Sequence, residues 1–376
     1  MCIRDSFNRN SISSRINCDR KWKATTTEFF KSITDMNIQE GIHLISSNKD
    51  LSQQDMSVIM TEILEGRSTD AQIGAFLIAL SIKGETIDEV IGAVNVMRKL
   101  STKVKTDIPN LVDTCGTGGS GIGIFNVSTS SAFVASDCGV KIAKHGNRSA
   151  TRKSGSADLL EEAGVSLSLS AEEVATCIKE IGLGFMFAPA HHSAMKHVVG
   201  PRKEIGQKSI FNILGPLTNP ASAKRQVLGV YDKKWMLPMA EVLRELGSEH
   251  LLIVHALDGL DEISIASPTL VVEMKEKEIF EYEINPEDFK FKTSSLDSLR
   301  VSSPKESLDL AKLALKGNHD QASAMVSMAA GAALYVSGIN DSLNLGIENA
   351  RSSINNAGGI ETVSYTHLRA HETPAN

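Results

Sequence analysis

The chain has 376 residues, 41 % of them hydrophobic and 22 % charged, with a formal net charge of −6. This is the composition of an ordinary soluble globular protein with one large or two unequal domains. The acidic balance and the lack of a basic run argue against nucleic acid as the main partner, and no apolar run is long enough to span a membrane. Five scattered cysteines without C-x-x-C pairs indicate reduced thiols in a cytoplasmic protein: Cys2, Cys18, Cys115, Cys138 and Cys177.

The two ends of the chain carry no functional motif. Residues 1–32 lack sustained periodicity, and residues 361–376 include His367 and His371 at helical spacing. The MCIRDS start and the SYTHLRAHETPAN end look like read-through of a sequencing adapter. We therefore expect both segments to be non-native additions and assign neither to a domain.

Residues 33–104 are predicted to form a small helical domain of four short helices. Apolar residues recur at helical spacing on two faces, formed by Val58, Ile59, Ile63 and Leu64, and by Ile73, Phe76, Leu77 and Leu80. Thr69 can cap the third helix, Thr86 and Glu89 form a capping box for the fourth, and Gly66 and Gly84 mark breaks. The domain lacks a cluster of catalytic side chains, so we expect it to pack on the rest, with residues near 190–205, and to form an interface.

Residues 105–360 alternate between strand and helix patterns. We predict strands over 111–115, 140–143, 184–187, 226–231, 250–255 and 270–273. We predict helices over 127–135, 158–162, 171–181, 234–246, 304–315 and 321–335, the last of them buried. This order predicts an α/β domain with a largely parallel central sheet, whose ligands bind at the carboxyl ends of the strands.

The densest chemical signal lies between residues 112 and 160. Five glycines between Gly116 and Gly123 precede a helix that opens with Asn126-Val-Ser-Thr129, and a glycine loop before a helix N-terminus favours phosphate. Gly116, Gly118 and Gly121 satisfy G-x-G-x-x-G, but the second predicted strand ends near Lys144 instead of an acid, and no G-K-[ST] follows. The stretch therefore predicts a cradle for a heavily phosphorylated small molecule that is neither a dinucleotide fold nor a P-loop.

Two later sequence features can supply a metal site and an anion-binding site at the carboxyl ends of the strands. Asp261-Glu262 follows an apolar strand and a turn at Asp258-Gly259, and paired carboxylates there suit Mg²⁺, although adjacent acids are often merely solvated. Arg202 carries a guanidinium that can bind a carboxylate through two hydrogen bonds, although a lone arginine is often a surface charge. The serines near Ser128 and the neighbouring His145 form no Ser-His-Asp arrangement.

Seven motifs occur in a fixed order: GTGG (116–119), N-x-S-T (126–129), KHGNR (144–148), KSGSAD (153–158), HHSAM (191–195) with Arg202, FNILGPLTNP (211–220) and DGLDE (258–262). In this combination, from about Ile38 to Gly359, the sequence resembles the anthranilate phosphoribosyltransferase family. The resemblance implies transfer of the phosphoribosyl group from phosphoribosyl pyrophosphate to anthranilate in tryptophan biosynthesis. It also implies Mg²⁺ as cofactor and a cytoplasmic homodimer formed through the helical domain.

The resemblance further assigns site residues. Phosphoribosyl pyrophosphate would be bound by Gly116, Thr117, Gly118, Gly119, Ser120, Asn126, Ser128, Thr129, Lys144, Asn147, Arg148 and Ser156. Anthranilate would be bound by Gly116, Asn147, His192 and Arg202, and the metal by Ser128, Asp261 and Glu262. No side chain would act as a chemical catalyst, because positioning and electrostatic stabilisation suffice for this reaction.

Three positions depart from the family pattern: Ser120 replaces a usual Asp, Met195 a frequent Tyr and Lys208 a common Arg. We expect Ser120 to shift the dependence on Mg²⁺ without abolishing activity. Two alternatives remain open, a pyrimidine nucleoside phosphorylase of the same fold and a non-enzymatic nucleic-acid-binding relative. KHGNR and Arg202 favour the transferase over the first, and the net charge of −6 speaks against the second.

Overall fold

The computed structural model describes residues 36–149 and 153–356. The expectations for residues 1–32 and 361–376 lie outside these residues. Within the described residues, no helix is long and apolar enough to cross a membrane. Cys115 and Cys138 are free thiols.

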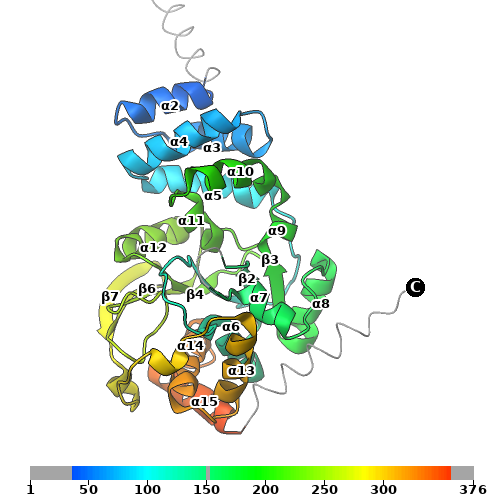
Figure 1. Ribbon diagram of the computed structural model, residues 1–376, viewed down its shortest axis with the longest axis vertical. Coiled ribbons are helices and arrows are strands. Elements are labelled where there is room, and N and C mark those ends of the chain that lie inside the picture. The colour runs from blue at the N-terminus through cyan, green and yellow to red at the C-terminus, as the bar shows by residue number, and fades with distance from the viewer. Residues whose placement is uncertain (1–35, 150–152, 357–376) are drawn as a thin grey trace, which may run out of the picture.

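The N-terminal part is a bundle of helices, drawn in blue and cyan in Figure 1. It comprises α2 (Ile38–Ser46), α3 (Gln53–Leu64), α4 (Asp70–Lys83) and α5 (Ile87–Leu100), as the sequence predicted. Capping boxes at Thr69 and Thr86 begin α4 and α5 and satisfy backbone N–H groups that have no partner inside the helix. A later helix, α10 (Lys196–Ile205), packs against α3 and α4 although the sequence pattern did not predict it as a helix.

A seven-stranded sheet forms the centre of the larger part. In chain order the strands are β1 (Val112–Gly116), β2 (Ile142–Gly146), β3 (Leu183–Phe187), β4 (Arg225–Gly229), β5 (His250–Ala256), β6 (Thr269–Lys275) and β7 (Glu278–Ile284). Their spatial order is β3-β2-β1-β4-β5-β6-β7, parallel from β3 to β5 and antiparallel at β6 and β7. The prediction of a largely parallel sheet is confirmed. Strand β7 was missed because most of its residues are exposed and three of its seven residues are Glu.

Helices cover both faces of this sheet (Figure 1). On one face α6 (Val127–Asp137), α13 (Pro304–Leu315), α14 (Asp320–Ser337) and α15 (Leu343–Asn355) pack into one apolar core with the strands. On the other, α12 (Met236–Glu245) shares a core with the helical bundle and with α11 (Phe211–Leu214). Helix α14 is buried as predicted, whereas α15 was not predicted. The second core runs without interruption from the bundle to the sheet, so the two parts are packed together.

Strand β2 begins and ends later than the sequence indicated. The prediction placed it at residues 140–143, but it runs from Ile142 to Gly146. Pairing with β3 extends it, because Lys144, His145 and Gly146 stand opposite residues 185–187. Lys144 and His145 are therefore inside a strand, not after its end as the sequence pattern predicted. Two smaller shifts occur elsewhere: residues 233–235 form a 3₁₀ turn before α12, and the strand predicted at 226–231 is β4, at Arg225–Gly229.

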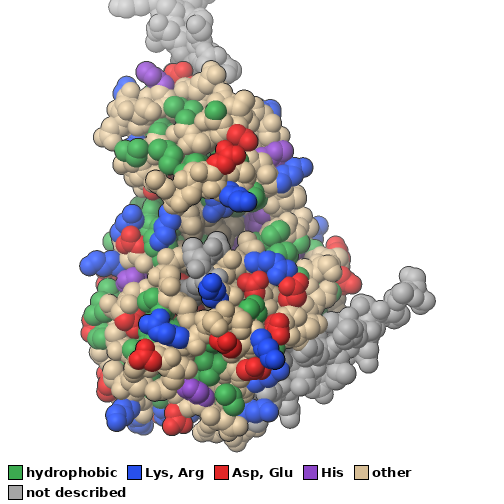
Figure 2. All heavy atoms as spheres, in the orientation of Figure 1, with side chains coloured by type: hydrophobic (Ala, Val, Ile, Leu, Met, Phe, Trp, Pro, Cys, Tyr) green, Lys and Arg blue, Asp and Glu red, His purple; other side chains and the backbone are tan. Residues whose placement is uncertain are grey.

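Helices α7 (Ser156–Glu162), α8 (Ala171–Ile181) and α9 (Ala188–His191) flank strands β2 and β3. Helix α8 leads into β3, and α9 follows that strand directly. Helix α7 lies after β2. The parallel strands β1, β2 and β4 have their carboxyl ends on the same side of the sheet, the side that faces the helical bundle (Figure 1). In Figure 2 the molecule is indented between the bundle and the larger part, and Lys and Arg side chains border this indentation.

Candidate functional site

The glycine loop leaves the carboxyl end of β1 and is tied to the end of β4. Gly118, Gly119 and Gly121 have φ values of 62°, 84° and 74°, a backbone region that side chains with a Cβ rarely adopt. The Thr117 N–H donates to Gly229 O at 2.9 Å, and Thr117 Oγ1 accepts from the Tyr231 N–H at 3.0 Å. The loop therefore has a defined shape in which backbone groups can approach a ligand closely.

Helix α6 begins beside this loop. Asn126 is its N-cap, and its side-chain oxygen accepts from the Thr129 N–H at 3.2 Å and from Thr129 Oγ1 at 2.6 Å. Asn126 and Thr129 thus shape the helix start, and their side chains are already paired with each other. The partial positive charge of this N-terminus adds to the cradle that the loop begins.

Lys144 lies beneath the cradle and is 2 % exposed. Its ammonium donates to Thr114 O and lies 3.3 Å from Ser128 Oγ. Burial lowers the pKa of Lys144, an effect that the nearby charges of Asp113 and Glu262 oppose. The lysine can hold positive charge under a phosphate group while supporting the ends of β1 and α6.

Asp113 anchors this arrangement from below, a role the sequence analysis missed. Its carboxylate accepts from the Asn219 amide at 2.8 Å and from the His145 N–H at 3.1 Å, and it is fully buried. Asn219 also donates to Ala143 O at 2.9 Å. Strands β1 and β2 pair only at Val112 and Ile142. After that pair, the Asp113 carboxylate and the Asn219 amide connect the two strands through their side-chain hydrogen bonds. The sequence signal was an acid inside a predicted strand, which is buried over residues 112–115.

The predicted metal ligands come together at the same edge. A Cβ atom at Gly116 would lie 3.5 Å from Asp261 Oδ2, and Glu262 lines a narrow cleft with Ser128 and Gly229. Hard oxygen donors of this kind suit Mg²⁺, which keeps several waters and commonly takes the rest of its ligands from a bound phosphate. Within residues 36–149 and 153–356, no group of three or more His, Cys, Asp or Glu residues forms a protein-only metal cage. The donor set therefore fits a metal held jointly by protein and substrate.

Gly229 was predicted only as part of a strand, yet this position tolerates no side chain. A Cβ atom there would lie 1.8 Å from the Asp261 carbonyl oxygen. The glycine lets the Asp261-Glu262 turn approach β4 and the glycine loop. It is thus a site-forming residue that sequence reasoning did not single out.

The residues after β2 are engaged with α7. Arg148 pairs with Glu161 at 2.7 Å and with Asp158 at 3.1 Å, and the pKa of its guanidinium is raised, chiefly by the hydrogen bond to Glu161. Ser156 Oγ donates to Asn147 O at 3.2 Å. Arg148, one of the predicted donor-site residues, is therefore bonded away from the cradle.

The predicted acceptor residues come from four elements: Gly116 ends β1, Asn147 follows β2, His192 follows α9 and Arg202 lies on α10. The His192 ring lies 5.1 Å from the His145 ring, centroid to centroid. The Nε2 atoms of both rings are buried and have no hydrogen-bond partner among the described residues. Burial lowers the pKa of His145 to about 3 and that of His192 to about 4, so both rings are neutral at pH 7.

Arg202, on α10, stacks over Phe211 at 5.4 Å from the ring centroid. Burial lowers the pKa of its guanidinium, and no ion pair to it occurs within the part of the chain that the structure describes. His192 and Met195 line a narrow slot together with three apolar residues of the helical bundle, Leu64, Met97 and Leu100. Helix α10 begins directly after Met195, and a guanidinium on it without an ion pair among the described residues is suited to a small carboxylate.

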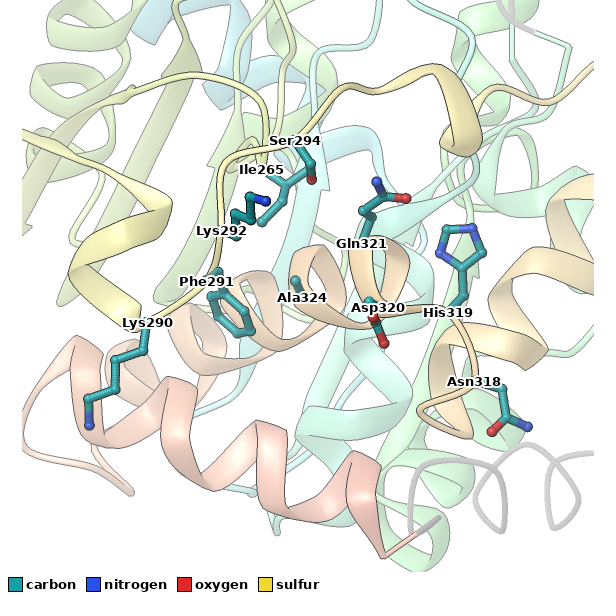
Figure 3. A pocket seen from close by; sticks show the side chains of 10 residues that line it. All are labelled: Ile265, Lys290, Phe291, Lys292, Ser294, Asn318, His319, Asp320, Gln321 and Ala324. Atoms are coloured by element: carbon teal, nitrogen blue, oxygen red, sulfur yellow. The ribbon is translucent and has the colours of Figure 1, made fainter.

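A separate cavity of about 620 Å³ lies away from these residues (Figure 3). It is formed by the segment at 290–294 and the start of α14, and it contains none of the predicted site residues. In Figure 3 the Lys290 side chain points away from its centre, and Lys290 pairs with Glu348 at 3.5 Å. The strand-end cradle, and not this cavity, is therefore the candidate active site.

Comparisons with known proteins identify relatives of both parts of the chain. Residues 108–359 match the glycosyl transferase family, a/b domain, and residues 39–101 match the glycosyl transferase family, helical bundle domain. The chain is 55 % identical over 335 residues to the anthranilate phosphoribosyltransferase of Marinomonas sp. (strain MWYL1), covering 89 % of this chain and 96 % of that protein. It is 54 % identical over 323 residues to that of Cellvibrio japonicus, covering 85 % of this chain and 94 % of that protein.

Solved structures are similar too. The crystal structure of anthranilate phosphoribosyltransferase from Thermus thermophilus has a TM-score of 0.83 at 36 % identity, covering 88 % of this chain and 99 % of that one. The enzyme from Saccharomyces cerevisiae in complex with PRPP and Mg has a TM-score of 0.80 at 26 % identity, covering 89 % of this chain and 97 % of that one.

Proposed function

This chain belongs to the anthranilate phosphoribosyltransferases, and we propose that the strand-end cradle is the donor half of its active site. As a member it transfers the phosphoribosyl group from phosphoribosyl pyrophosphate to anthranilate, giving N-(5-phosphoribosyl)anthranilate and pyrophosphate in tryptophan biosynthesis. The donor assignment is supported by one observation: three elements meet at the carboxyl ends of the strands. These are the left-handed glycine loop, the N-terminus of α6 and the buried Lys144 ammonium.

In this proposal the loop and helix start receive the pyrophosphate. Backbone N–H groups from residues 116–120 and the Ser128 hydroxyl donate to the pyrophosphate oxygens. The Lys144 ammonium stabilises the negative charge of the pyrophosphate. Asn126 and Thr129 hold the helix start in place through their mutual hydrogen bonds. Asn147 and Ser156 bound the ribose side, and Arg148 would need to leave Glu161 before it could reach a phosphate.

Mg²⁺ is the proposed cofactor, with Ser128, Asp261 and Glu262 as its protein donors. When bound, it would spread the negative charge of the departing pyrophosphate. The two residues are adjacent in the chain, the Asp261 carboxylate lies close to Gly116 and Glu262 lines the cleft with Ser128, which supports this assignment.

For the acceptor, we assign the anthranilate carboxylate to Arg202 and its ring to the slot beside His192 and Met195. Gly116 and Asn147 border the same space from the donor side. The amine nitrogen attacks C1 of the ribose, the C1–O bond breaks and its electron pair leaves with pyrophosphate, and the new arylammonium then loses a proton. None of these steps requires a side-chain nucleophile, so the chain contributes mainly orientation and electrostatic stabilisation.

The helical bundle is the proposed dimer interface, and we place the enzyme in the cytoplasm. Ile82 on α4 is 82 % exposed and Val199 on the adjoining α10 is 57 % exposed. A second copy of the chain would cover such apolar side chains. Sedimentation of the wild-type chain and of Ile82→Asp would test this assignment, since the charge should shift a dimer toward monomer.

The activity is tested by following anthranilate fluorescence with phosphoribosyl pyrophosphate, with and without Mg²⁺. We expect metal-dependent consumption of anthranilate and release of one pyrophosphate for each anthranilate consumed. Phosphate-dependent cleavage of thymidine without anthranilate turnover would instead identify a nucleoside phosphorylase. Salt-dependent retardation of DNA without either activity would identify a nucleic-acid-binding relative.

A further inference from the structure

Lys208 contacts the glycine loop from the acceptor side of the site. Its Nζ donates to Gly119 O at 3.2 Å and lies 3.4 Å from the centroid of the Tyr231 ring. Gly119 has a φ of 84°, and a Cβ atom there would lie 3.5 Å from Lys208 Nζ. One ammonium thus joins the loop to an aromatic face that itself follows β4.

Tyr231 is attached to the same loop from below. Its N–H donates to Thr117 Oγ1 at 3.0 Å, and Thr117 in turn is bonded to Gly229. The Lys208 ammonium and the Tyr231 backbone therefore hold successive parts of the loop, near Gly119 and at Thr117. An ammonium over a tyrosine ring adds a modest attraction to the hydrogen bond.

Lys208 also belongs to the segment that carries the proposed acceptor ligand. Helix α10, which contains Arg202, ends at Ile205 and is capped by Gly206 with a φ of 62°, and Lys208 follows two residues after that glycine. A displacement of α10 toward a bound carboxylate would therefore move the ammonium that holds Gly119. The same short stretch of chain reaches both halves of the site.

We propose that Lys208 is a positioning residue that orients the Gly119–Ser120 peptide for the pyrophosphate of the donor. The proposal rests on the proposed function of the cradle. In a trans peptide the C=O and the following N–H point in opposite directions. Because Lys208 holds Gly119 O on its own side, the Ser120 N–H is directed to the other side of the loop. Without the ammonium, the peptide can rotate and turn its carbonyl oxygen toward the substrate's negative charge.

The test compares Lys208→Met with Lys208→Arg, using Lys275→Met as the matched control. Lys275 lies 5.1 Å from the centroid of the Tyr335 ring, so the control also removes an ammonium over a tyrosine, but away from the loop. For Lys208→Met we expect the KM for phosphoribosyl pyrophosphate to rise about tenfold, the scale of one charge-assisted hydrogen bond. The KM for anthranilate should stay within about twofold, because Arg202 is retained. Arg at 208 should restore most of the loss, since a guanidinium can both donate to a carbonyl and stack on a ring.

A second measurement needs no substrate. Hydrogen exchange of the amides at residues 117–121 in the free protein should be several times faster in Lys208→Met than in wild type and in Lys275→Met. Unchanged exchange and an unchanged donor KM would overturn the proposal, as would a parallel rise of both KM values with a lowered Tm. Faster loop exchange in a protein that does not turn over anthranilate would overturn the proposed function and leave the loop contact standing.

Discussion

The donor and acceptor halves of the site differ in how far their polar atoms are already paired. On the donor side, Asp113, Thr117 and Asn126 all make hydrogen bonds that shape the cradle. On the acceptor side, the His145 and His192 Nε2 atoms have no partner among the described residues, and Arg202 is stacked on Phe211 without an ion pair there. The donor cradle is thus built by the fold itself, whereas the acceptor pocket carries desolvated groups that a carboxylate can pair with.

The largest effect should come from breaking the donor side at Asp113. Asp113→Asn places an amide against the Asn219 and His145 donors and removes the negative charge near Lys144. Losing one partner of a buried charged network costs about 3 kcal/mol or more in the free energy of unfolding. Urea unfolding measures this loss. Asp309→Asn, on the exposed side of α13, is the control and should change stability little. Equal effects of the two changes would show that the buried network does not stabilise the donor side.

The next effect concerns the metal donors. Asp261→Asn together with Glu262→Gln should raise the Mg²⁺ concentration for half-maximal rate about tenfold or more, because charge attraction at a partly solvated site is worth several kcal/mol at most. Raising the metal concentration should recover part of the rate. Titration of activity with Mg²⁺ measures the shift, and superimposable titration curves would remove these residues from the metal site.

A change on the acceptor side should leave the donor side intact. Arg202→Ala should raise the KM for anthranilate by about 10- to 100-fold, the range expected for a hydrogen bond to a charged group. The KM for phosphoribosyl pyrophosphate should stay nearly constant. Lys203→Ala, an exposed neighbour on the same helix, is the matched control. Parallel increases in both KM values would indicate that Arg202 supports the fold instead of the acceptor.

The smallest effect is the pH dependence of stability. The pKa values of His145 and His192 in the folded protein, about 3 and about 4, lie below the ordinary value of 6.5. Below about pH 6.5 the unfolded chain therefore binds more protons than the folded chain. The contribution of the two neutral rings to the free energy of unfolding is fully present above that pH and is lost as the pH falls. We expect a loss of about 1 kcal/mol per ring between pH 7 and pH 5.5. Tm measured over this range should fall less in His192→Asn than in wild type, and equal slopes would contradict the buried neutral ring.

Much of the fold could be predicted because its signals are local. The capping boxes at Thr69 and Thr86, the apolar periodicity of α4 and the glycine loop after β1 each depend on residues close together in the chain. Alternation of strands and helices was enough to predict a largely parallel sheet with its ligand edge. Strand β7 and helix α15 escaped prediction because β7 is mostly exposed and α15 carries many polar residues.

The sequence by itself thus determined the cradle, the order of its motifs and the family to which they point. Only the tertiary structure decided which charged groups face which partners. Arg148 and Arg202 are both arginines beside site motifs, yet one is held by Glu161 while the other stacks on Phe211. Asp113 meets Asn219 across 106 positions, and Lys208 meets Gly119 across 89. Such pairs have no local signature, because long polar side chains choose partners by the packing of distant elements and by the cost of leaving a buried group unpaired.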